Sequence, residues 1–190
     1  MITGILAPRM IGFRFSGMNL EYLQRQYTDK NGVHSYLPLY EKILSPIRES
    51  AENVLEIGIA QGGSIKLWYD YFKKATIYGC DIQDVVKIPE IKNNNRIILD
   101  CINNAYEEEY VKKTFLDKEI KFDFMLDDGS HTLEHQVAFI KLYSPLMKNN
   151  GILMIEDIQQ MQFISTLKSA TPEHLKQYIE IYDLRRNKNR

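Results

Sequence analysis

The sequence predicts a doubly wound α/β fold with a mostly parallel sheet. Six short runs rich in β-branched and aromatic residues recur along the 190 residues, and helical patterns separate them. Strands and helices in alternation require right-handed crossovers, which place helices on both faces of a parallel sheet. The length suits one domain, and no internal repeat or long linker divides the chain.

The expected elements follow from hydrophobic periodicity. The predicted strands are residues 53–59, 76–82, 96–101, 122–128, 151–158 and 178–185. Amphipathic helices are expected over residues 63–73 and 132–147. At the N-terminus, Pro8, Arg9 and Arg14 interrupt an apolar run before it resembles a signal peptide. We therefore expect a single domain over residues 1–190, with residues 1–26 as an N-terminal arm.

Composition limits which binding partners and which cellular compartment we expect. Lys and Arg total 24 against 25 Asp and Glu, so a formal net charge of −1 gives no reason to expect nucleic acid or an anionic membrane as partner. No stretch approaches the roughly 20 apolar residues that span a bilayer. Cys80 and Cys101 are too few for a disulfide framework. We expect reduced thiols and a cytoplasmic location.

Four of the six predicted strands end in or just after acidic residues. These residues are Asp81, Asp100, Asp127 with Asp128, and Glu156 with Asp157. Ligands in doubly wound sheets bind beyond the carboxyl ends of the strands. Solvated strand ends also carry acids, but four on one rim favour a binding site.

A glycine turn follows the first predicted strand. Gly58, Ala60 and Gly63 have the spacing of a dinucleotide fingerprint whose middle glycine is replaced. Asp81, at the end of the next strand, is placed to accept hydrogen bonds from ribose hydroxyls. NAD and S-adenosylmethionine both fit this pattern. Glu56 favours S-adenosylmethionine, because a carboxylate near the turn suits the sulfonium and ammonium groups of that cofactor better than the pyrophosphate of NAD.

The acidic residues at the ends of the fourth and fifth predicted strands indicate a metal site. Asp128, Glu156 and Asp157 would lie within a few ångströms of one another, which is costly unless a cation neutralises them. Oxygen ligands favour Mg²⁺, with Mn²⁺ or Ca²⁺ as alternatives. Acids that face solvent or cap the next helix are the other interpretation.

His131 lies three residues beyond Asp128 and is expected at the start of a helix. Imidazole titrates near neutrality, so His131 is the candidate general base for a weakly acidic hydroxyl. Ser130 is interpreted as the helix N-cap. His131, Glu134 and His135 also match a zinc peptidase pattern, but His131 emerges from a strand-end loop, so we interpret Glu134 and His135 as helix-surface residues.

Taken together, these motifs resemble the metal-dependent sugar O-methyltransferases of the macrocin and mycinamicin type, which have the Rossmann-like class I methyltransferase fold. The likeness covers roughly residues 27–186, which we take as the catalytic core. The motifs that carry it are Glu56-x-Gly58, Asp81, Asp127-Asp128-Gly129-Ser130-His131 and Glu156-Asp157, with residues 27–30 and 34–40 upstream.

The resemblance implies a site and a reaction. Asp128, Glu156 and Asp157 would bind the metal, with His131 as the catalytic base. The cofactor-binding set for S-adenosylmethionine would be Glu56, Gly58, Ala60, Ser64, Asp81, Ile82, Asp100 and Asp127, with Asp100 near the adenine. His34 and Tyr36 are candidate contacts to cofactor or substrate. The acceptor would be a sugar hydroxyl of a glycan or a glycosylated small molecule. A catechol or other vicinal diol as acceptor, a non-catalytic S-adenosylmethionine-binding module and an NAD-dependent oxidoreductase are the alternatives.

The C-terminus departs from the family pattern. In the family, a strand like residues 178–185 is followed by a polar turn and a final antiparallel strand, whereas here the turn is the end of the chain. We expect a sheet that lacks this strand or receives it from another chain. The exposed edge would allow a homo-oligomer to form.

Overall fold

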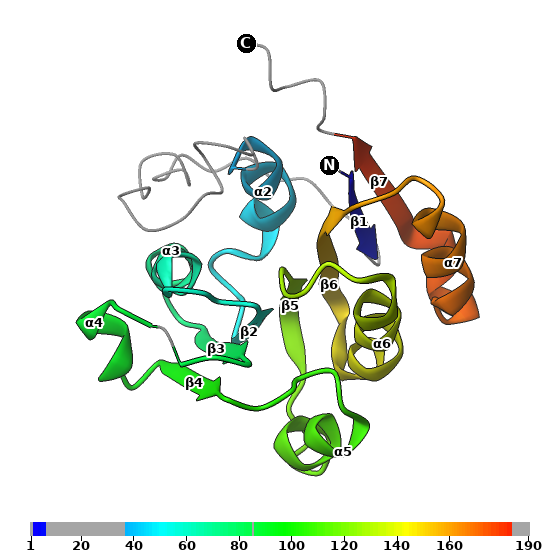
Figure 1. The fold of residues 1–190 in the computed structure, drawn as a ribbon. Helices are drawn as coiled ribbons and strands as arrows, with labels where there is room; N and C mark the ends of the chain where they lie inside the picture. The colour runs from blue at the N-terminus through cyan, green and yellow to red at the C-terminus, as the bar shows by residue number, and fades with distance from the viewer. Residues whose placement is uncertain (1, 7–36, 85, 184–190) are drawn as a thin grey trace.

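The structure, a computed structural model, describes residues 2–6, 37–84 and 86–183. Its strands form one seven-stranded sheet in the order β4-β3-β2-β5-β6-β1-β7 (Figure 1). The strands are β1 (Ile2–Leu6), β2 (Asn53–Ile57), β3 (Thr76–Asp81), β4 (Ile97–Cys101), β5 (Phe122–Asp127), β6 (Met147–Ile158) and β7 (Ile179–Asp183).

The helices connect the strands as the sequence predicts. They are α2 (Leu37–Leu44), α3 (Gly63–Tyr71), α4 (Pro89–Lys92), α5 (Glu108–Val111), α6 (Leu133–Tyr143) and α7 (Phe163–Ala170). Short helical turns cover Ser45–Ile47, Lys112–Leu116, Ser144–Leu146 and Glu173–Tyr178. The helix expected to end at residue 147 ends earlier, because Pro145 follows its last turn. None of the helices in the described ranges is both long and apolar enough to cross a membrane.

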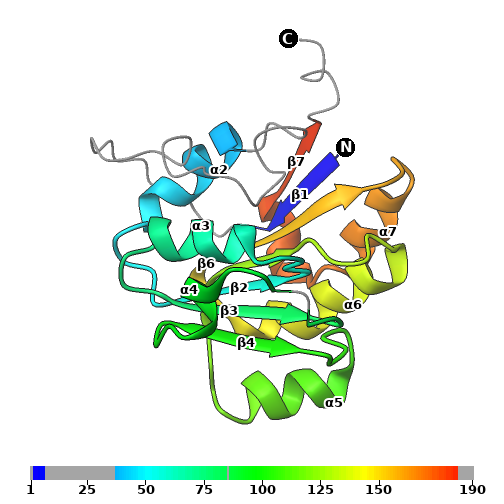
Figure 2. The same ribbon diagram turned by 60° about the vertical axis from the view of Figure 1, so that its left-hand side comes forward.

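The sheet separates two hydrophobic cores. Strands β4, β3, β2, β5 and β6 pair in parallel, and successive side chains of each strand face opposite sides. Val54 and Leu126 therefore pack in the core under α2, α3 and α4, whereas Leu55 and Met125 pack in the core under α5, α6 and α7. Figure 2 shows the helices on both faces of the sheet. The doubly wound α/β prediction is confirmed.

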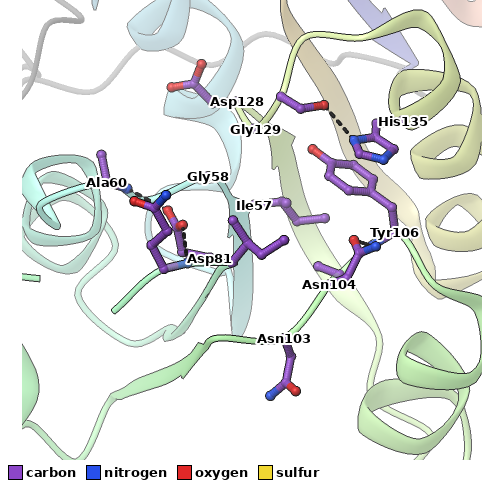
Figure 3. Close-up of a pocket in the computed structure, with 14 residues that line it drawn as sticks. Ile57, Gly58, Ala60, Asp81, Asn103, Asn104, Tyr106, Asp128, Gly129 and His135 are labelled. Carbon is purple, nitrogen blue, oxygen red and sulfur yellow. Dashed lines mark hydrogen bonds between the residues drawn. The ribbon is translucent and has the colours of Figure 1, made fainter. Parts of the chain in front are cut away.

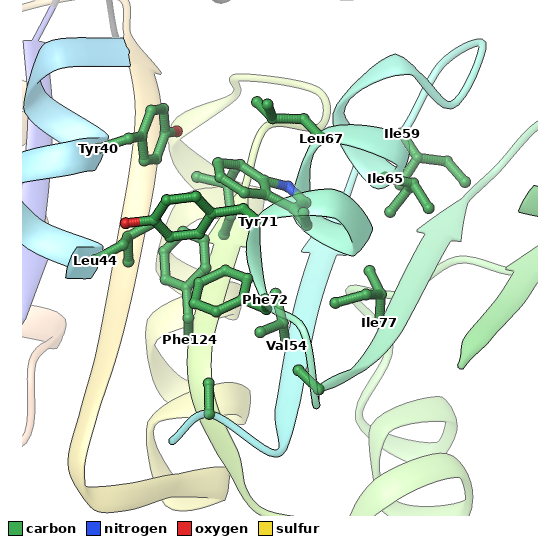
Figure 4. Packing of buried hydrophobic residues seen from close by; sticks show 14 of the residues in the cluster. Tyr40, Leu44, Val54, Ile59, Ile65, Leu67, Tyr71, Phe72, Ile77 and Phe124 are labelled. Atoms are coloured by element: carbon green, nitrogen blue, oxygen red, sulfur yellow. The ribbon is translucent and has the colours of Figure 1, made fainter. Parts of the chain in front are cut away.

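Aromatic side chains fill the first of these cores (Figure 4). Trp68 of α3 is fully buried and meets Tyr40 of α2 and Phe124 of β5 edge-on, with ring centroids 5.0 and 5.5 Å apart. Such pairs add about 1 kcal/mol each to the free energy of burial. They fix α3, and with it the glycine turn that precedes α3, against the sheet.

The place of the antiparallel strand that the sheet was expected to lack is taken by β1. Strand β1 pairs antiparallel to β6, with Leu6 opposite Leu153, and antiparallel to β7, with Leu6 opposite Ile179. Residues 2–6, which the sequence analysis assigned to an arm, therefore complete the sheet. Backbone donors and acceptors on the facing edges of β6 and β7 need partners, and an antiparallel strand from the N-terminus satisfies them. His34 and Tyr36 lie outside the described residues.

Candidate cofactor and metal site

A cavity of about 320 Å³ opens at the carboxyl ends of the parallel strands (Figure 3). Its walls come from the segments that follow β2, β3, β4 and β5 and from the first turn of α6. The lining residues are Ile57, Gly58, Ala60, Asp81, Ile82, Gln83, Asn103, Asn104, Ala105, Tyr106, Asp128, Gly129, Ser130 and His135. The predicted ligand-binding edge of the sheet therefore carries a cavity.

Gly58 brings the turn after β2 against the loop after β5. Its φ of +84° lies in the left-handed region, and a Cβ at this position would overlap the Asp128 carbonyl oxygen and the Gly129 Cα. The Asp128 amide donates to the Ile57 carbonyl at 2.9 Å. Only glycine permits both this conformation and this approach, so one residue joins two walls of the cavity.

Asp81 holds the glycine turn. Its Oδ2 accepts hydrogen bonds from the amides of Ile59 and Ala60 at 3.0 and 2.9 Å, and its Oδ1 accepts one from the Gln83 amide at 2.9 Å. A carboxylate has about four acceptor positions. Hydrogen bonds from the described residues leave one position on Oδ1, which can accept a hydrogen bond from a hydroxyl in the cavity.

Four of the residues predicted to bind the cofactor line the cavity, namely Gly58, Ala60, Asp81 and Ile82. The other four are Glu56, Ser64, Asp100 and Asp127, and they lie outside the lining set. Glu56 is fully buried, and its Oε2 accepts a hydrogen bond from Trp68 Nε1 at 2.9 Å. Asp100 accepts hydrogen bonds from the Asn103 side chain and the Tyr110 hydroxyl. Glu56 and Asp100 therefore form hydrogen bonds with residues that line the cavity or lie behind its wall.

Asp127 is buried behind the wall, with 2% of its surface exposed. Its Oδ1 accepts hydrogen bonds from the Tyr106 hydroxyl at 2.5 Å and from the Gly129 amide at 3.3 Å. Burial raises the pKa of Asp127 to about 6, although both donors oppose that rise. Burial and the nearby Asp127 carboxylate also raise the pKa of Tyr106, so its hydroxyl stays protonated as a donor.

Several cavity residues were not predicted from the sequence, and two of them, Tyr106 and His135, contact each other. Tyr106 and His135 stack with ring centroids 4.2 Å apart and planes 10° apart. His135 Nδ1 shares a hydrogen bond of 2.6 Å with Ser130 Oγ. His135 is therefore not merely a helix-surface residue, and the N-cap of α6 is Thr132, not Ser130. No local pattern gives this pairing, because residues 106 and 135 belong to distant segments that meet only when the sheet has formed.

A cluster suited to a metal ion lies beside the cavity. Asp128, His131 and Asp157 each offer one ligand atom, and these atoms all lie within 4.8 Å of one another. Glu156, predicted as a ligand, is buried and outside this cluster. Neighbouring strand residues point to opposite faces, which explains why Glu156 and Asp157 diverge. Two carboxylates and an imidazole fit a divalent ion that keeps several water ligands.

The backbone of this cluster is strained. His131 and Asp157 have φ values of +59° and +55°, in the left-handed region that non-glycine residues rarely occupy. Such conformations cost about 1–3 kcal/mol each and concentrate at functional sites. Of the five non-glycine residues with positive φ among the described residues, these two lie in the loops that the acidic motifs single out.

Comparisons with known proteins give no matching family model but several curated relatives. A tetracenomycin-C rhamnosyl 2'-O-methyltransferase of Streptomyces olivaceus is 31% identical over 142 residues, which are 71% of this chain and 36% of the relative. The mycinamicin VI 2''-O-methyltransferase of Micromonospora griseorubida is 32% identical over 151 residues, 73% of this chain and 35% of the relative. The solved mycinamycin-pathway methyltransferase MycE, in complex with Mg and S-adenosylhomocysteine, superposes with a TM-score of 0.61 at 28% identity, over 68% of this chain and 36% of MycE.

The chain is a homologue of the sugar O-methyltransferases of the macrocin and mycinamicin type. This sugar O-methyltransferase homologue spans about a third of the length of the curated relatives it matches. Its sheet is that of the class I methyltransferase fold.

Proposed function

We propose that the protein transfers a methyl group from S-adenosylmethionine to a sugar hydroxyl of a glycan or a glycosylated small molecule, with the help of a divalent metal ion. One observation carries the proposal. Asp128 both lines the cavity and belongs to the cluster with His131 and Asp157. A methyl donor in the cavity and an acceptor beside the cluster would therefore lie next to each other. The homology to sugar O-methyltransferases supports this choice of acceptor.

The cavity residues suit the donor. The remaining acceptor position of Asp81 would take a ribose hydroxyl. The glycine turn brings backbone close to the ligand, and Ile82, which is largely exposed at the cavity, offers apolar surface for a purine. Glu56, Ser64, Asp100 and Asp127 would support these walls. This arrangement fits a nucleoside cofactor.

The cluster would position the acceptor and remove its proton. Asp128 and Asp157 would hold Mg²⁺, with Mn²⁺ as an alternative, and His131 would accept the proton of the hydroxyl. A bound divalent ion lowers the pKa of a coordinated hydroxyl. The acceptor oxygen would attack the methyl carbon in line with the departing sulfur, forming a C–O bond as the C–S bond breaks and leaving S-adenosylhomocysteine. The protein mainly contributes proximity and alignment.

The proposal extends to domain and compartment. Residues 27–186 would form one catalytic domain that β1 completes from the N-terminus. Cys80 and Cys101 are both free thiols, which supports a reducing compartment such as the cytoplasm.

The test measures methyl transfer from S-adenosylmethionine to a panel of glycosylated acceptors, with and without Mg²⁺. We expect transfer that chelator abolishes and Mg²⁺ restores. His131→Ala should lose at least about 100-fold in turnover and keep S-adenosylhomocysteine affinity, measured by calorimetry. Transfer to catechols alone would reassign the acceptor. Cofactor binding without transfer to any acceptor would indicate a binding module, and hydride transfer with NADH would overturn the proposal.

A further inference from the structure

A single side chain from the segment after β4 holds the loop of residues 127–131. The Tyr106 hydroxyl donates to Asp127 Oδ1 at 2.5 Å. The same hydroxyl lies against Gly129 so closely that a Cβ there would overlap it. Asp128 and His131 belong to this loop, so the contact of Tyr106 bears on the position of two of the three residues of the candidate metal cluster.

The ring of Tyr106 holds the same loop by a second route. It stacks on His135, and His135 Nδ1 shares a hydrogen bond with Ser130 Oγ. The loop is thus fixed at Asp127, Gly129 and Ser130 by one stacked pair. Ring stacking adds about 1 kcal/mol beyond the area buried.

Tyr106 is itself fixed to the rest of the fold. Its amide donates to Asn104 Oδ1 at 3.1 Å, and the neighbouring Ala105 carbonyl accepts from the buried Tyr143 hydroxyl of α6 at 2.7 Å. These hydrogen bonds connect the stacked pair to the segment after β4 and to α6.

Both stacked rings also line the cavity, across from Ala60 and Asp81 (Figure 3). A ligand in the cavity contacts the same pair that holds the loop. We infer that Tyr106 is a positioning residue that couples binding of S-adenosylmethionine in the cavity to binding of the metal ion at Asp128 and Asp157. This inference rests on the proposed function, and it predicts that each ligand tightens the binding of the other by the same factor.

The experiment measures Mn²⁺ binding by the loss of its free electron paramagnetic resonance signal, with and without saturating S-adenosylhomocysteine. This product carries no sulfonium charge, so direct repulsion between the two ligands does not mask the coupling. In the wild-type protein we expect the product to tighten Mn²⁺ binding at least about fivefold. Calorimetric titration of the product with and without Mn²⁺ should give the same factor.

Tyr106→Phe removes the hydroxyl and keeps the stacked ring. We expect it to bring the coupling factor to within about twofold of unity while each ligand still binds alone. Tyr78→Phe is the matched control. Tyr78 is a half-buried tyrosine of β3 that packs against Phe115 and Phe122, away from the cavity, and the substitution removes only its hydroxyl. This control should keep the wild-type factor. His135→Ala, which removes the stack instead of the hydroxyl, should also lower the factor.

A Tyr106→Phe protein with the wild-type coupling factor would overturn the inference, as would a wild-type protein that binds both ligands with no coupling. A wild-type protein that binds no S-adenosylhomocysteine would instead overturn the proposed function, and the inference with it. Thermal unfolding of each variant separates loss of coupling from loss of fold.

Discussion

The turn after β2 and the loops after β5 and β6 meet at one edge of the sheet, yet they keep their shape by different means. In the turn, the amides of Ile59 and Ala60 donate to the carboxylate of Asp81, and glycine occupies two of the three left-handed positions, Gly58 and Gly62, with Ala60 at the third. In the two loops, the left-handed positions belong to His131 and Asp157, where a side chain makes the conformation unfavourable.

This difference separates a preformed half of the site from a strained half. Hydrogen bonds within the turn are present before any ligand arrives, so binding there needs little reorganisation. The loops instead keep side chains with chemical functions at positions where glycine would be more stable. A lower free energy of unfolding because of His131 and Asp157 is expected where the fold maintains a ligand-binding geometry. Four substitutions test this contrast.

Gly58→Ala should have the largest effect, because Gly58 is the contact between the two halves. The new methyl group would overlap the loop after β5 at Asp128, and the left-handed φ would cost a further 1–2 kcal/mol or so. We expect a loss of about 3 kcal/mol or more in the free energy of unfolding, with both ligand sites lost. Urea denaturation measures it. Ala60→Gly, at another left-handed position of the same turn, is the control and should not destabilise; an equally stable Gly58→Ala protein would contradict the contact.

Asp128→Asn should affect the strained half alone. The amide is isosteric but removes one negative ligand from the cluster, so Mn²⁺ affinity and methyl transfer should each fall about 10–100-fold. Affinity for S-adenosylhomocysteine should stay within about twofold, since the backbone contact with Gly58 is unchanged. Separate titrations with Mn²⁺ and with S-adenosylhomocysteine measure the two affinities. Equal loss of both would show that the two halves are not separable.

Asp81→Ala should affect the preformed half alone. Three amides lose their acceptor, which costs about 1–3 kcal/mol, and affinity for S-adenosylhomocysteine should fall while Mn²⁺ affinity is kept. Asp84→Ala, which removes an exposed carboxylate 3.7 Å from Lys92, is the control and should change stability by less than about 0.5 kcal/mol. A turn that binds the product equally well without Asp81 would contradict its supporting role.

His131→Gly compared with His131→Ala should give the smallest effect. Both lack the imidazole and should be inactive, but glycine adopts a φ of +59° without strain. We expect His131→Gly to be more stable by about 1 kcal/mol, or about 2–4 °C in Tm. Calorimetric unfolding measures the difference. Equal Tm values would remove the evidence for strain in this loop.

Local patterns predicted most of the fold. Alternating and helical periodicities placed β2 to β7 and the helices α3 and α6 within a few residues, because each pattern reports which face of an element is buried. The strand-end acids were located for a similar reason, since parallel strands bring their carboxyl ends to one edge. Asp128, His131 and Asp157 meet there.

Three features did not follow from local patterns. Strand β1 was assigned to an arm, because its place between β6 and β7 depends on two edges formed more than 140 residues later. The stack of Tyr106 on His135 joins two segments that share no motif. The direction of Glu156 depends on the pleat of β6 and on the left-handed turn at Asp157.

The sequence by itself determined the layer architecture, the edge of the sheet that carries the site and the chemical groups available there. These depend on periodicity and on the order of elements, which are properties of neighbouring residues. Tertiary structure alone decided which strand completes the sheet and which side chains touch across the cavity. Those contacts depend on packing between distant segments, whose geometry is set only when the whole sheet has formed.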